Sequence, residues 1–124
     1  MNVVDSSAWL EYLTNGSHAS FFATAITDTK ALLVPSICIV ELGCKILRER
    51  GDDAWLTVRG VLEAGTIVPL DGDLAAFAAE LNTRTRLPLA DSIIYATAVL
   101  HNATLWTQDA DFSGLPDVKY KAKK

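Results

Sequence analysis

The chain has 124 residues, half of them hydrophobic, and its 15 acidic and 11 basic residues give a net charge of −4. This length predicts a single domain spanning residues 1–124, since single domains most often contain about 100 to 150 residues. No apolar stretch approaches the roughly 18 residues needed to cross a bilayer, so we expect a soluble globular protein without a membrane partner. The start MNVVDSSAW has no basic region and an early acid, which favours the cytoplasm over export.

Short β-type stretches alternate with helical patterns along the chain. We predict strands at 2–4 (NVV), 31–34 (ALLV), 66–70 (TIVPL) and 103–107 (ATLWT). We predict helices at about 7–14, 19–28, 36–50, 53–64, 73–84 and 89–101, with breaks at Asn15-Gly16, Gly51-Asp52, Gly65 and Pro88. Strands separated by helices favour an α/β fold, with a parallel sheet covered on both faces. The lysine-rich end, residues 119–124, is predicted to fray.

Acidic residues follow several of the predicted strands. Asp5 comes directly after the first strand, and Asp109 and Asp111 follow the last. Glu41 falls in the second turn of the helix after the second strand, and Asp91 opens the helix after Pro88. Because ligands of such folds bind outside the carboxyl ends of the strands, these acids are candidate site residues.

Each acid also has an ordinary structural explanation. Asp5 and Asp91 are both suited to N-cap a helix, a role worth about 1 kcal/mol. Glu41 is spaced for an ion pair with Lys45, one helical turn later. Asp109 and Asp111 fit a turn, since aspartate side chains hydrogen-bond the nearby backbone there.

The surroundings of two acids favour a binding role. Asp91 is the only charged residue of the apolar segment LADSIIYATAVL, and Glu41 shares a helix face with Ile37 and Cys44. A buried carboxylate costs several kcal/mol unless a cation compensates it. Carboxylates without His or Cys suit Mg²⁺ or Mn²⁺. Removing four acids (Asp5, Glu41, Asp91 and Asp109) leaves 11 acids against 11 bases, so these four account for the net charge of −4.

Three segments together resemble the PIN domain: VVDSSAWLEYL, VPSICIVELG and LPLADSIIYATAVLHNATLWTQDADF. The similarity covers residues 2 to about 114, and the compact size is similar to VapC-type ribonuclease toxins of toxin–antitoxin pairs. It implies a three-layer α/β/α fold around a mostly parallel sheet of about four to five strands. It also implies metal ligands at Asp5, Glu41, Asp91 and Asp109, a provisional ligand at Asp111, and supporting hydroxyls at Ser7 and Thr107.

The resemblance implies an endoribonuclease in which Mg²⁺ or Mn²⁺ binds the scissile phosphate and activates water, so that no nucleophilic side chain is required. It further implies a homodimer silenced by a cognate antitoxin protein. Trp9, Leu13 and Trp55 are candidates for an exposed apolar patch at such interfaces, with core packing as the alternative. Phosphate contacts would come from local clusters, namely Arg48 with Arg50, Arg84 with Arg86, or the tail lysines, for all of which a solvated surface is the alternative.

Two other classes remain open on sequence grounds. A phosphoacceptor receiver domain has this length and acids at strand ends, but it requires paired acids after the first strand and a late lysine. Here Ser6-Ser7 follows Asp5, and no lysine directly follows the last predicted strand. A non-catalytic PIN-like scaffold that only binds a partner is the second alternative, and the complete set of acids argues against it.

Overall fold

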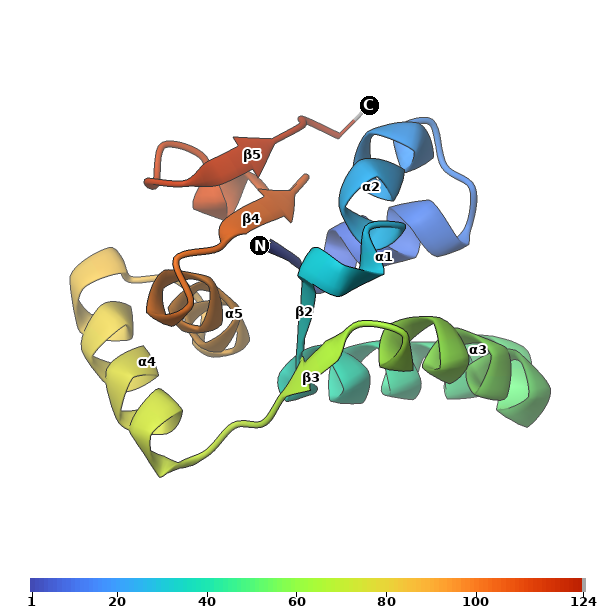
Figure 1. The fold of residues 1–124 in the computed structure, drawn as a ribbon, viewed down its shortest axis with the longest axis horizontal. Helices are drawn as coiled ribbons and strands as arrows, with labels where there is room; N and C mark the ends of the chain where they lie inside the picture. The colour runs from blue at the N-terminus through green and yellow to red at the C-terminus, as the bar shows by residue number, and fades with distance from the viewer. Residues whose placement is uncertain (124) are drawn as a thin grey trace.

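The protein contains one sheet of five parallel strands in the order β3-β2-β1-β4-β5 (Figure 1). The structure, a computed structural model, describes residues 1–123. The strands are β1 (Asn2–Val4), β2 (Leu32–Pro35), β3 (Thr66–Val68), β4 (Thr104–Thr107) and β5 (Val118–Tyr120). Two short 3₁₀ helices, η1 (Thr29–Ala31) and η2 (Ala110–Phe112), precede β2 and follow β4. The predicted parallel sheet is confirmed, and all five strands are parallel.

Helices cover both faces of the sheet, as expected from the alternation of strands and helices. On one face lie α4 (Gly72–Thr85) and α5 (Leu89–Leu100), and on the other lie α1 (Ser6–Leu13), α2 (Ala19–Ile26) and α3 (Ser36–Glu63) (Figure 1). The chain therefore has the three-layer α/β/α architecture. Within residues 1–123, no helix is both long enough and apolar enough to cross a membrane.

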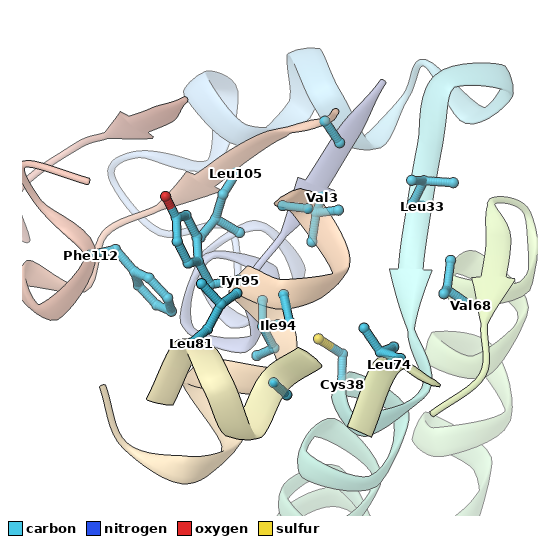
Figure 2. Packing of buried hydrophobic residues seen from close by; sticks show 14 of the residues in the cluster. Val3, Leu33, Cys38, Val68, Leu74, Leu81, Ile94, Tyr95, Leu105 and Phe112 are labelled. Atoms are coloured by element: carbon cyan, nitrogen blue, oxygen red, sulfur yellow. The ribbon is translucent and has the colours of Figure 1, made fainter. Parts of the chain in front are cut away.

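Alternation along the strands produces two separate cores. Val3, Leu33 and Leu105 are neighbours in the sheet and pack against α4 and α5 (Figure 2). The next residue along β1 and β4, Val4 and Trp106, points to the opposite face and packs against α1, α2 and α3. Successive strand side chains face opposite sides, so a strand of three residues contributes to both cores.

Helix α3 is two helices that meet at Gly51. The backbone of Gly51 has φ 85° and ψ −175°, which lies outside the helical region. The second half runs back alongside the first (Figure 1), and a Cβ atom at Gly43 would lie 3.1 Å from the ring of Trp55. The predicted helix break at Gly51-Asp52 is confirmed.

One expectation from the sequence is wrong at this level, and one alternative is excluded. Residues 119 and 120 do not fray, because they belong to β5, which pairs with β4 from Leu105–Val118 to Thr107–Tyr120; Lys124 lies outside the described residues. The observed strand order also differs from the 2-1-3-4-5 order of receiver domains. The receiver alternative is therefore rejected.

Replacing glycine by alanine should have opposite effects on the free energy of unfolding at two positions of α3. Gly51→Ala should lower the free energy of unfolding by about 1 to 3 kcal/mol, because its backbone conformation is essentially restricted to glycine. Gly60→Ala should raise it by up to about 1 kcal/mol, since Gly60 is helical and a Cβ there meets no atom within 4 Å. Urea denaturation of both variants measures the difference. Equal changes in the free energy of unfolding would contradict the helix break assigned to Gly51.

Candidate metal centre

The predicted acids gather where the strand order reverses. The chain passes from β1 outward to β2 and β3, and returns to the other side of β1 as β4 and β5. Loops leaving neighbouring strands in opposite directions at such a point open a crevice at the carboxyl edge of the sheet. Asp5 directly follows β1, and Thr107 ends β4. These two residues therefore lie side by side at the carboxyl edge of the sheet, joined by a hydrogen bond.

Asp5 is a buried carboxylate, 3% exposed, whose two oxygens both accept hydrogen bonds. Oδ1 accepts from the Ser7 hydroxyl and the Ala8 backbone N–H, both at 2.9 Å. Oδ2 accepts from the Thr107 hydroxyl at 2.6 Å. Burial raises the pKa of Asp5, while these hydrogen bonds act in the opposite direction. The N-cap role expected for Asp5 is confirmed, and a carboxylate has lone pairs left for a further ligand.

The Thr107 side chain connects Asp5 to the acids after β4. Its hydroxyl donates to Asp5 and accepts from the backbone N–H of Asp109 at 2.9 Å. The Asp109 carboxylate in turn accepts from the Asp111 N–H at 2.9 Å. The next residue, Phe112, is completely buried and anchors η2 in the core below. The turn expected at these acids is present, and it fixes the position of both carboxylates.

Asp91 projects from the first turn of α5 towards the acids after β4. Helix α5 is N-capped by Pro88, so the N-cap role proposed for Asp91 is wrong. The turn before α5 is held by Asn82, whose side-chain amide donates to the Leu87 carbonyl at 2.7 Å and the Ser92 hydroxyl at 2.9 Å. One carboxylate oxygen from each of Asp91, Asp109 and Asp111 lies within 4.8 Å of the other two.

The field within this group is strongly negative. Burial, followed by the charges of Asp109, Asp5, Glu41 and Asp111, raises the pKa of Asp91 from its ordinary value of 3.8 to about 7. The four charged neighbours include both acids outside the close group, Asp5 and Glu41. All five predicted acids therefore contribute to one electrostatic site, although three of them form the close group.

Glu41 faces this site from the first half of α3. Its carboxylate accepts from the Ser6 hydroxyl at 2.7 Å. The ion pair expected between Glu41 and Lys45 is wrong, because Lys45 pairs instead with Glu49 at 2.9 Å. Cys38 lies one turn earlier on α3, fully buried, and burial raises its pKa, to which the charges of Glu41, Asp5 and Asp91 add. Its thiol is therefore protonated at neutral pH.

The composition of the site suits a hard divalent cation. Its donors are carboxylate oxygens, which Mg²⁺ and Mn²⁺ prefer. Within residues 1–123 the two ion pairs, Lys45–Glu49 and Arg59–Glu63, involve none of the site acids. The negative charge is thus left uncompensated by the chain itself, and a divalent metal would neutralise it. The residues present fit such an ion.

The sequence indicated only some of the residues that support the acids. Ser7 and Thr107 were proposed as supporting hydroxyls, and both hydrogen-bond Asp5. Ser6 was missed, because two adjacent serines give no indication of which one reaches α3. Asn82 was missed because it lies ten residues from Ser92 in sequence. The buried Gln108, which donates to the Ser7 carbonyl at 3.3 Å, was missed because amides after a strand usually face solvent.

Comparisons with known proteins agree with this geometry. The family profile described as "PIN domain" matches residues 3–118. No curated protein matches the sequence at a significant level. A toxin–antitoxin complex from Klebsiella pneumoniae contains a similar chain, with a TM-score of 0.83, 22% identity and coverage of 96% of each chain.

Two further solved structures share the fold. VapC20 from Mycobacterium tuberculosis, described as a sarcin–ricin loop cleaving toxin, has a TM-score of 0.77 and 16% identity, covering 95% of this chain and 97% of its own. VapBC2 from Rickettsia felis, bound to a promoter DNA fragment, has a TM-score of 0.76 and 15% identity, covering 98% and 97%. With the PIN profile spanning almost the whole sequence and the acids grouped at the switch point of the sheet, the chain belongs to the PIN domain family.

Proposed function

We propose that the chain is a Mg²⁺- or Mn²⁺-dependent endoribonuclease and the toxin of a type II toxin–antitoxin pair. One observation carries the proposal: the carboxylates of Asp91, Asp109 and Asp111 lie close together, and the charges of Asp5 and Glu41 act on the same group. Within residues 1–123, neither ion pair involves any of these acids. Such an arrangement costs stability in the absence of metal, because the charges repel one another. A grouping of carboxylates that costs stability is expected where a bound metal serves a reaction.

Membership of the PIN family and the similarity to toxin chains support this proposal. The Klebsiella pneumoniae structure is a toxin–antitoxin complex, and the Mycobacterium tuberculosis toxin cleaves the sarcin–ricin loop. We carry over from them the general class of activity, RNA cleavage, and the kind of partner, an antitoxin. The cytoplasm, where both RNA and antitoxin are made, is the corresponding site of action.

The chain's own residues would act by position and charge. A divalent cation, when bound, supplies the positive charge that polarises the phosphate and favours deprotonation of the attacking water. Asp91, Asp109 and Asp111 would hold it, with Asp5 and Glu41 as the other proposed ligands. Thr107 keeps Asp5 and Asp109 in fixed positions. Cys38 is excluded as a nucleophile, because its thiol is buried and protonated.

We propose that the antitoxin binds an apolar groove between α1 and α3. The groove has a volume of about 230 Å³ and is lined on its two walls by Leu13 and Ile46, among others. Helix α1 has eight residues, about 12 Å, and its first turn is capped by Asp5. One partner segment can therefore fill the groove and place a cationic side chain among the acids, where it competes with metal.

The apolar patch expected from the sequence is only partly present. Trp9 is completely buried and belongs to the core, so its assignment to an exposed patch was wrong. Leu13 lines the groove, and Trp55 packs against the first half of α3. Exposed apolar side chains lie elsewhere, including Val40 at 58% and Leu89 at 73%. We propose that these residues, on the two helices that carry Glu41 and Asp91, contribute to a homodimer interface.

Neutralising single acids should abolish cleavage. Asp5→Asn and Asp91→Asn should each lower the rate of RNA cleavage by about 100-fold or more, since each removes part of the charge that binds metal. Asp109→Asn should be more damaging than Asp111→Asn, because Asp109 is held by Thr107 and Asp111 is exposed. The measurement is RNA cleavage with Mg²⁺ and with EDTA, with the exposed Asp28→Asn as control.

Inducible expression of the chain without its partner extends this trial to cells. Growth should stop with the wild-type chain and continue with Asp91→Asn. Full cleavage by the Asp5 and Asp91 variants would reject the site, and RNA binding without any cleavage by the wild type would favour the non-catalytic scaffold.

The metal-free protein should lose stability as the pH rises. The pKa of Asp91 is 3.8 ordinarily and about 7 in the fold, so the folded state binds more protons than the unfolded chain between about pH 4 and 7. Its melting temperature should fall across that window, and less so in Asp91→Asn. Mg²⁺ should stabilise the wild type above pH 7, by about 2.7 kcal/mol at 100 times its Kd. A pH profile shared by Asp91→Asn and wild type would contradict the assignment.

The partner should inhibit by competing with metal. Inhibition by the purified antitoxin should weaken as Mg²⁺ is raised, and when the Arg or Lys of its tail that enters the site is replaced by Ala. Light scattering of the chain before the antitoxin is added should give the mass of two chains. Inhibition that does not depend on Mg²⁺ would reject competition at the site, and a single-chain mass would reject the homodimer.

A further inference from the structure

Two lysines of the last strand are held against an aromatic surface beside the candidate metal centre. The ammonium of Lys119 lies 4.5 Å from the centre of the Trp106 ring, and that of Lys121 lies 5.6 Å from the centre of the Phe21 ring. These two rings are themselves in contact, with centroids 5.2 Å apart. Each lysine is exposed. The contacts with the rings therefore restrict the positions of the two ammonium groups, which remain exposed to solvent.

The two ammonium groups are arranged in a row along the direction of β5. Lys119 pairs with Trp106 in the register of β4 and β5. Lys121 directly follows the end of β5, and its ammonium lies over Phe21 on the same side of the sheet. Two residues of strand span about 7 Å. The row runs towards the carboxyl edge of the sheet, because β5 is parallel to the strands that end in the site acids. In Figure 1 the end of β5 extends towards α2, which carries Phe21.

The backbone of the row ends next to the end of β4, while the lysine side chains share the α2 face with Trp106 and the Thr107 side chain points to the other face. The backbone N–H of Lys121 donates to the carbonyl of Thr107 at 2.9 Å, and the hydroxyl of Thr107 donates to Asp5. The fixed order along the sheet edge is thus Lys121, Thr107 and Asp5. A polyanion that crosses the carboxyl edge of the sheet from the α2 face would pass these positive charges before it reached the carboxylates.

The charge balance favours cationic side chains near the site if the substrate is an anion. The chain has a net charge of −4, and the acids of the site would repel phosphates that are not directly bound to metal. Within the described part of the chain, neither lysine takes part in the two ion pairs, which use Lys45 and Arg59. Their charge is therefore available to a ligand.

We propose that Lys119 and Lys121 form a track for the phosphate backbone of single-stranded RNA, which leads the strand along β5 into the candidate metal centre. This inference rests on the proposed ribonuclease function, and names the surface that holds the substrate outside the reacting phosphate. The track reads backbone charge and not base identity, so it contributes affinity and orientation without sequence preference.

The test compares two double substitutions with the same change of charge. Lys119→Gln with Lys121→Gln removes the track, whereas Lys30→Gln with Arg59→Gln removes two other exposed cations, neither of them a candidate phosphate contact. Lys30 lies in η1, directly before β2, and β1 and β4 separate β2 from β5 in the sheet. Both pairs are made in the Asp91→Asn background with Mg²⁺, which keeps the RNA intact, and the Kd of a short fluorescein-labelled single-stranded RNA is measured by anisotropy against salt concentration.

The track substitution should weaken binding about 10-fold at low salt and reduce the slope of log K against log salt by about 1.4, since each phosphate contact on a single strand contributes about 0.7. The control pair should change Kd less than twofold. Lys119→Arg with Lys121→Arg should restore binding, because charge and not exact packing is required. Equal losses in both glutamine pairs, an unchanged Kd in the track pair, or no rescue by arginine would each overturn the proposal.

Cleavage by the wild-type chain is measured separately. Absence of cleavage together with lysine-dependent binding would reject the ribonuclease and keep the track. Cleavage together with lysine-independent RNA binding would keep the ribonuclease and reject the track, and would assign these lysines to a protein partner.

Discussion

The hydrogen bond between Thr107 and Asp5 is the interaction on which the site depends. A carboxylate that is 3% exposed requires donors on both of its oxygens, and Thr107 is the donor that comes from another strand. It joins the ends of β1 and β4, which are separated by about a hundred residues in sequence. The same hydroxyl accepts from the Asp109 N–H. The loop after β4 is therefore positioned by the hydroxyl that also satisfies the Asp5 carboxylate.

The rest of the site follows from the parallel topology. Each parallel strand requires a crossover connection before the next, and these crossovers are the helices that carry Glu41 and Asp91. The crossovers therefore bring acids from distant parts of the sequence to one edge of the sheet. Helix packing alone would not hold the group, since its members repel one another. Two neighbours of the acids, the buried Phe112 of η2 and the partly buried Asn82 amide beside α5, supply the opposing constraint.

Much of this arrangement could be read from the sequence, for physical reasons that apply to particular residues. Asp5 and Asp109 could be predicted because Asp5 directly follows a short apolar strand, Asp109 lies two residues after another, and parallel strands end at one edge. Asp91 was accessible because it is the only charge in an apolar helix. The fifth strand was not, because Val118, Lys119 and Tyr120 alternate like many exposed tails, and only pairing with β4 distinguishes them.

The hydrogen-bond and ion-pair partners of side chains were harder to predict from the sequence than the positions of the acids at the strand ends. Lys45 has acids four residues away on both sides, at Glu41 and Glu49, and sequence spacing does not choose between them. The structure pairs it with Glu49, because Glu41 is turned towards Ser6. The burial of Trp9 was equally undetermined, since a short amphipathic helix can present an aromatic ring to the core or to solvent.

The two outer strands have a consequence for how copies of this chain meet. Each edge strand has only three residues; β5 carries Lys119, and β3 is followed by Pro69, which has no N–H to donate. Short, charged or proline-bounded edges are poor templates for the addition of another strand. Association through a continuous intermolecular sheet, the route to fibrous aggregates, is therefore disfavoured at both ends. Contacts between copies are left to helix side chains, where they can be reversible and specific.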